Sequence, residues 1–155
     1  MKLILLILGL ISSATQSEFV MGKNFTGYIF NEKHFVFMSI ENQEKRYTPT
    51  KNEIYDIEDL LKKEISCMNK NLINQPKGFP KIHRKMGKYI RQYVGFINKS
   101  NEKVIWINFI WKDNYTKKQL SEDIINVHDG GSYYWNIQIN LTKKTLSNLQ
   151  INGVG

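Results

Sequence analysis

Cysteine is nearly absent from this chain, which has one among its 155 residues, Cys67. A single cysteine excludes an intramolecular disulfide and a zinc site built from several cysteines. Long apolar runs are also missing: the longest, Leu3 to Ile11, is under half of the roughly 20 residues that a transmembrane helix needs. Acidic residues are few, 14 against 22 Lys and Arg, giving a net charge of +8. That excess favours acidic partners without naming one.

Catalytic motifs are lacking as well. The sequence contains no G-x-S-x-G, no P-loop, no dinucleotide fingerprint and no H-E-x-x-H, so we expect no cofactor, no metal and no enzymatic activity. One alternative stays open: His128 and Asp129 precede a Gly-Gly turn and could serve a small hydrolase as an acid/base pair. Neighbouring residues of a strand point to opposite faces, which disfavours that pairing.

The first 17 residues have the three-part layout of a secretory signal peptide: Lys2, an apolar run, then small and polar residues. We therefore predict an exported protein, periplasmic or extracellular, with no transmembrane span after the signal is removed. Residues 18–33 are mixed and contain glycine, so we expect a flexible lead-in with a short strand possible at 27–30. Residues 34–155 are predicted to form a single domain.

The strongest secondary-structure signal follows Thr50. Thr50 and Glu53 have the spacing of a capping box, in which the hydroxyl and the carboxylate each accept a backbone N–H at the start of a helix. Apolar residues then recur at steps of three and four, which predicts a helix of about 22 residues that ends before Pro76. Glu58 and the other helix acids are expected on the surface. The apolar stripe consists of Ile54, Ile57, Leu61, Ile65, Met68 and Leu72.

Strand-like segments surround this helix. Residues 34–40 are rich in strand formers, and 88–97 with 104–111 read as an antiparallel hairpin. Residues 133–141 alternate, so we expect Trp135, Ile137 and Ile139 to face the helix and the polar residues between them to face water. A short last strand follows near 149–151. The predicted loops are 41–46, 74–87 and 112–122, and 124–127 could be a short strand.

No strand–helix–strand alternation appears, which disfavours a parallel sheet. The sequence therefore predicts an α+β fold in which one long helix packs on an antiparallel sheet of about four to six strands.

The segment 129–142, followed by 149–153, resembles the ending of small exported proteins of bacteroidete bacteria, and 47–50 and 91–98 are similar too. Roughly residues 47–155 are covered. That family is uncharacterised; the resemblance implies export and a cystatin-like α+β architecture and no catalytic residues.

A basic stretch precedes and enters the predicted hairpin. Its candidate binding residues are Lys81, Arg84, Lys85, Lys88 and Arg91. Such a stretch could bind an acidic protein or polysaccharide, or simply be a solvated loop. The signal peptide and the lack of any nucleic-acid-binding module argue against nucleic acid.

Aromatic residues supply the second candidate surface. Both faces of the predicted hairpin carry aromatic or branched residues, and one helix covers only one face, so Tyr93, Trp106 and Trp111 could line an exposed patch of the kind that binds partners. We therefore predict an exported, non-catalytic module, monomeric or weakly dimeric, that binds a protein or glycan through this face and the basic loop. The alternative is a secreted or periplasmic inhibitor or immunity-type protein.

Overall fold

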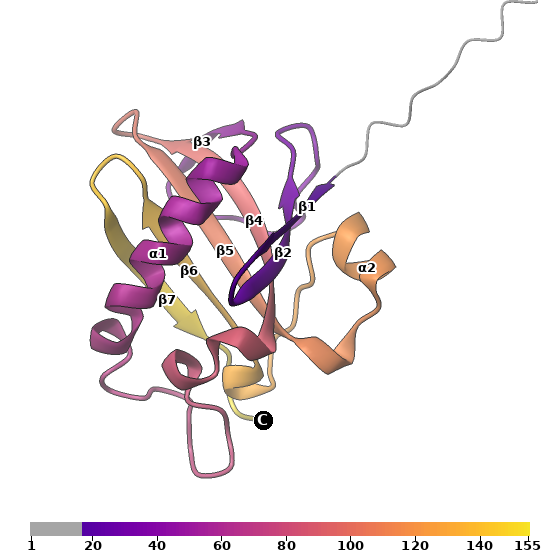
Figure 1. The fold of residues 1–155 in the computed structure, drawn as a ribbon, viewed down its shortest axis with the longest axis vertical. Coiled ribbons are helices and arrows are strands. Elements are labelled where there is room, and N and C mark those ends of the chain that lie inside the picture. The colour runs from indigo at the N-terminus through magenta and orange to yellow at the C-terminus, as the bar shows by residue number, and fades with distance from the viewer. Residues whose placement is uncertain (1–16) are drawn as a thin grey trace, which may run out of the picture.

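A computed structural model describes residues 17–155, so the predicted signal segment lies almost wholly outside the described residues. The described chain is an α+β fold built on one seven-stranded sheet (Figure 1). None of its helices is long and apolar enough to cross a membrane. The strands are β1 (Ser17–Gly22), β2 (Phe25–Phe30), β3 (Gln43–Tyr47), β4 (Tyr89–Asn98), β5 (Lys103–Trp111), β6 (Tyr134–Asn140) and β7 (Thr145–Ile151), and the α-helices are α1 (Lys51–Met68) and α2 (Lys117–Glu122).

The strand order is β1-β2-β4-β5-β6-β7, with β3 paired to the far half of β4. All neighbours are antiparallel except β2 and β4, which are parallel. A parallel pair needs a long crossover, and the chain supplies one through β3 and α1. The prediction of a mainly antiparallel sheet under one long helix is therefore confirmed, with more strands than expected.

Helix α1 begins where the sequence predicted and ends earlier. The Thr50 hydroxyl accepts the Glu53 N–H, and the Glu53 carboxylate accepts the Thr50 N–H at 2.9 Å. At the other end Asn69 is the C-cap, and Leu72 takes a positive φ of 50°, so the apolar period past Met68 is not helical. The helix is 18 residues long.

The first layer of the core lies between α1 and the sheet (Figure 1). The predicted inward face of residues 133–141 is confirmed, because Trp135, Ile137 and Ile139 are buried against the helix stripe. Trp135 stacks on Phe109 of the next strand with 3.6 Å between ring centroids.

The N-terminal segments differ from the prediction. Residues 18–33, expected as a flexible lead-in outside the domain, form the β1–β2 hairpin at one side of the sheet. Residues 34–40, expected as a strand, are irregular, and the expected loop 41–46 contains most of β3. The reason is competition for the edge of β4. Strand β2 pairs with one half of that edge and β3 with the other, so residues 34–40 have no free part of β4 with which to form backbone hydrogen bonds.

The second face of the sheet is covered by the chain itself. A second buried cluster forms there, in which Ile40 from the loop after β2 and Leu120 from α2 pack on sheet residues. Helix α2 has its own capping box from Thr116 and Gln119, which the prediction of a loop over 112–122 missed. The expectation of a water-facing side on β6 is also wrong, since Gln138 is 5% exposed and donates to the Glu41 carbonyl.

Candidate functional site

The aromatic candidates do not form an exposed surface. Tyr93 is 0% exposed and belongs to the core under α1, and Trp106 is 4% exposed within the second cluster. Trp111 is partly buried and packs edge-on against Tyr89 and Tyr133. The predicted docking patch is therefore corrected: the loop 34–42 and the segment around α2 cover the face that one helix leaves open.

The basic candidates separate into two groups. Lys81, Lys85 and Lys88 lie around the loop before β4, where Lys85 and Lys88 are exposed and Lys81 donates to the Gln75 carbonyl. Arg84 and Arg91 instead line one cavity together. Arg91, expected in a solvated basic stretch, is 1% exposed.

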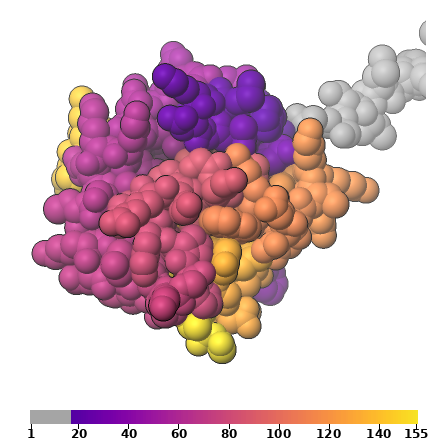
Figure 2. Space-filling view, turned by 60° about the horizontal axis from the view of Figure 1, so that its bottom comes forward, coloured from indigo at the N-terminus to yellow at the C-terminus, as the bar shows by residue number. Residues whose placement is uncertain are grey.

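This cavity, which we call the basic cavity, has a volume of about 410 Å³. It lies where the β1–β2 turn, α1 and the two 3₁₀ turns before β4 (Ile82–Arg84 and Met86–Lys88) adjoin one another, on the side of the molecule seen in Figure 2. The lining residues are Lys23, Asn24, Phe25, Glu58, Asp59, Lys62, Ile65, His83, Arg84, Met86, Gly87 and Arg91.

A buried ion pair forms the floor of the basic cavity. The Arg91 Nε donates to Glu58 Oε1 at 3.1 Å and its Nη2 donates to Oε2 at 3.3 Å, so the contact is bidentate. The Tyr93 hydroxyl donates to the same Oε1 at 2.8 Å. Burial, and then the Glu58 carboxylate, raise the pKa of Tyr93 well above its ordinary value. Tyr93 therefore remains a donor throughout the physiological range.

Four of the five N–H groups of Arg91 have hydrogen-bond acceptors among the described residues. Its Nη1 donates to the Met86 and Tyr89 carbonyls at 3.0 and 2.8 Å, and its guanidinium lies over the Phe109 ring, 5.2 Å from the centroid. A buried charge is costly unless it is paired and hydrogen-bonded, and Arg91 is paired with Glu58 and nearly fully hydrogen-bonded. The two formal charges of the floor cancel.

The rim of the basic cavity is positive. Lys23 comes from the β1–β2 turn, Lys62 from α1 and Arg84 from the loop before β4, while the one acid at the rim is Asp59. Burial, and then the positive charges of Arg91 and Lys88, lower the pKa of Lys112.

His83 stands at the rim in a defined protonation state. Gln75 Oε1 accepts the Ile82 N–H, which fixes the orientation of the amide that pairs with Asn69. The Asn69 Nδ2 is therefore a donor, and His83 Nδ1, 2.9 Å away, accepts from it. Burial, and then Arg84, lower the pKa of His83. The ring is neutral at pH 7 and carries its proton on Nε2.

The lowered pKa of His83 predicts a pH-dependent stability. The unfolded chain binds a proton near pH 6.5 and the folded chain only at lower pH, so the free energy of unfolding falls as the pH drops through that window. His83→Gln keeps an acceptor for Asn69 and cannot titrate, so its urea-unfolding free energy should change less between about pH 7 and 5. His128→Gln, an exposed control, should retain the wild-type slope; equal slopes in all three proteins would contradict this assignment.

Glu58 is the member of the site that sequence reasoning misplaced. It was expected on the helix surface. The signal for burial was present, because position 58 lies four residues after Ile54 and three before Leu61 and so falls on the apolar stripe. The hydrolase candidates do not converge: His128 and Asp129 are both exposed, and no hydrogen bond joins their side chains in the described structure.

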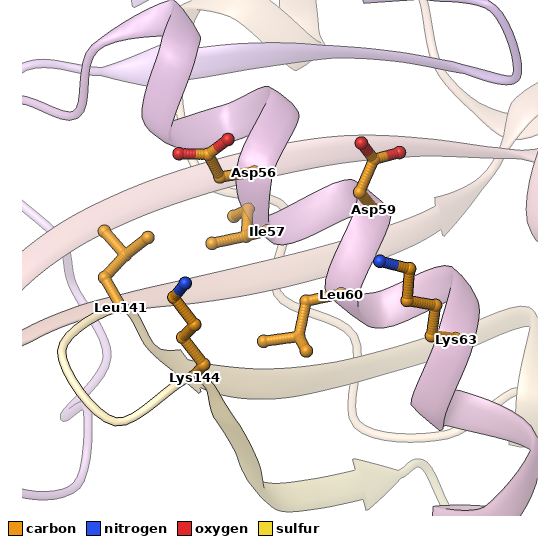
Figure 3. A pocket seen from close by; sticks show the side chains of 7 residues that line it. All are labelled: Asp56, Ile57, Asp59, Leu60, Lys63, Leu141 and Lys144. Atoms are coloured by element: carbon orange, nitrogen blue, oxygen red, sulfur yellow. The ribbon is translucent and has the colours of Figure 1, made fainter.

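Two other hollows have a different character. One, of about 310 Å³, lies between α1 and the β6–β7 turn and is lined by two aspartates, two lysines and three aliphatic residues (Figure 3). Its charges cancel and it contains no buried polar group. The other, of about 220 Å³, is rich in Asn and lies beside Trp106, whose Nε1 donates to Asn136 Oδ1 at 3.1 Å. Neither hollow has a net charge that would favour a ligand of the opposite charge.

Neither a protein-family model, nor a curated protein, nor a solved structure matches this chain.

Proposed function

We propose that the protein is a small exported module that binds, without catalysis, an acidic saccharide at the basic cavity. The observation that carries this proposal is the buried Arg91–Glu58–Tyr93 network under a rim of three cations. The floor is already neutral, so it needs no ligand to be stable. The rim charges of Lys23, Lys62 and Arg84 are not cancelled by the single Asp59.

The cavity geometry favours a small anionic group over a folded protein surface. A volume of about 410 Å³ falls within the usual range of small-ligand sites and suits one charged sugar unit. The three cations belong to three separate segments and line the same cavity, so they surround it rather than following one helix or strand. A carboxylate or sulfate entering between them is partly removed from water, which strengthens its attraction to each cation.

The adjacent lysines of α1 provide a matched test. Lys62 lines the basic cavity, whereas Lys63 lines the neutral hollow of Figure 3, and both are exposed. Calorimetric titration with a sulfated and a uronate oligosaccharide should show binding that weakens with salt, and none with a neutral oligosaccharide. Lys62→Glu should reduce affinity by about tenfold or more, equivalent to about 1.4 kcal/mol.

Lys63→Glu changes the net charge equally and should leave affinity within about twofold, because it lies outside the basic cavity. Equal losses in the two variants would indicate diffuse attraction to a basic protein and would overturn the proposal. The sulfated and uronate ligands distinguish recognition of a sulfate from recognition of a carboxylate. If neither ligand binds, the proposal is also rejected.

A further inference from the structure

A buried pair of side-chain amides lies behind one wall of the basic cavity. Asn69, the C-cap of α1, is 2% exposed, and Gln75 is 3% exposed. Each amide donates to the other: the Asn69 Nδ2 to Gln75 Oε1 at 3.0 Å, and the Gln75 Nε2 to Asn69 Oδ1 at 2.6 Å. Buried polar groups are stable only when they are hydrogen-bonded, and this pair meets that condition.

Backbone groups fix the orientation of both amides. Gln75 Oε1 also accepts the Ile82 N–H at 2.9 Å, and its Nε2 also donates to the Ile73 carbonyl at 3.2 Å. Because a backbone N–H only donates and a carbonyl only accepts, the oxygen and nitrogen of Gln75 are assigned without ambiguity. The second N–H of the Asn69 amide is then left for His83 Nδ1, which lies 2.9 Å away and must accept it.

His83 lines the basic cavity beside Arg84. Its proton is on Nε2, and no acceptor for that N–H is found among residues 17–155. A cationic ring would set an Nδ1–H against the N–H of Asn69, so the amide pair favours the neutral ring. Burial, and then Arg84, act in the same direction and lower the pKa of His83. The ring is thus an uncharged donor with its hydrogen available to a ligand.

We propose that Asn69 holds His83 as a neutral N–H donor to the anionic group of the bound saccharide, which makes His83 a specificity-determining residue and Asn69 a positioning residue. This inference rests on the proposed function of the basic cavity. The rim cations attract any anion, whereas a ring N–H requires an acceptor in line with it. A hydrogen bond to a charged oxygen changes affinity by about tenfold or more.

Asn69→Asp reverses the hydrogen bond to the ring. A carboxylate only accepts, so the neutral ring of His83 would carry its proton on Nδ1 and lose the Nε2 donor. The new charge would also raise the pKa of His83, so that a cation with both donors forms as the pH falls. In calorimetric titration with the sulfated oligosaccharide, this variant should bind about fivefold or more tightly at about pH 6 than at pH 8, whereas the wild type should change by less than about twofold.

The other charges around His83 are the same in the wild type and in Asn69→Asp. They come from the β1–β2 turn, α1, the loop before β4 and β4 itself. A difference between the two pH profiles therefore reports the ring of His83. The charged residues that share the cavity with it are Lys23, Glu58, Asp59, Lys62, Arg84 and Arg91.

Substitutions of His83 itself separate the donor from the bulk of the ring. His83→Leu should weaken binding about tenfold at pH 7, because it removes the donor. His83→Gln should recover most of that loss, since its amide can accept from Asn69 and donate to the ligand. His128→Leu is the matched control, exposed outside the basic cavity, and should bind like the wild type. Circular dichroism checks folding, and these variants decide the question should Asn69→Asp fail to fold.

The outcomes distinguish this inference from the proposed function. If the wild type binds and His83→Leu binds equally well, or if a folded Asn69→Asp protein keeps the flat pH profile, the role of His83 is overturned and the cavity remains an anion site. If neither the sulfated nor the uronate oligosaccharide binds the wild type, both proposals fail. The imidazole nitrogen shifts of the free protein give a check without ligand: a proton on Nδ1 of His83 at neutral pH would also overturn the inference.

Discussion

Replacing Arg91 with alanine is expected to lower the free energy of unfolding by about 3–5 kcal/mol, the usual cost of removing one member of a buried ion pair. The side chains of Arg91 and Glu58 are 1% and 9% exposed. Without the guanidinium, the Glu58 carboxylate keeps only the Tyr93 hydroxyl as a partner, and the Met86 and Tyr89 carbonyls lose their donor. Urea unfolding followed by circular dichroism measures the effect.

A double variant separates the loss of a partner from the loss of packing. Arg91→Met combined with Glu58→Leu removes both charges and retains most of the side-chain volume, so it should recover much of the lost stability. A single Arg91→Ala variant that costs under about 1 kcal/mol, as an exposed ion pair would, contradicts the description of this pair as the buried floor of the cavity.

Replacing Trp106 with alanine is expected to cost about 3–5 kcal/mol, the range found for large aromatic residues in cores. Trp106 is 4% exposed, belongs to the cluster beneath Ile40 and Leu120, and donates its Nε1–H to Asn136. Truncation leaves a cavity under the loop 34–42 and an unpartnered amide. Thermal and urea unfolding measure the loss.

Phe37→Ala is the control for that experiment. Phe37 comes from the same covering loop but is 84% exposed, so its truncation should change stability by less than about 0.5 kcal/mol. A Trp106→Ala protein with wild-type stability would contradict the covered face and would restore the exposed aromatic surface that the sequence suggested.

Capping and periodicity patterns in the sequence correctly located the elements that form through residues close together in the chain. The Thr50–Glu53 box and the apolar stripe located α1, and the alternation at Trp135, Ile137 and Ile139 identified the face that meets it. Both patterns are set by neighbours a few residues apart. The helix end was misjudged because Leu72 continues the period although its backbone has left the helical region.

The elements that depend on distant partners were not predictable in this way. Residues 34–40 have strand composition, but β2 and β3 already occupy the edge of β4. The cover over Trp106 comes from the loop 34–42 and the segment around α2, and the prediction of a single long helix included neither. In the site, Arg91 was identified as a basic residue, and its burial follows from Glu58, which is 33 residues away in the sequence.

Nuclear magnetic resonance mapping of the oligosaccharide site tests the central claim most directly, namely that the cations over the Arg91–Glu58 floor form one anion site. On titration with a sulfated or uronate oligosaccharide, amide shifts should gather at residues 23–25, 62, 83, 84, 86 and 87, which line the basic cavity. Shifts spread over all exposed lysines, or centred on the hollow beside Trp106, would contradict the account.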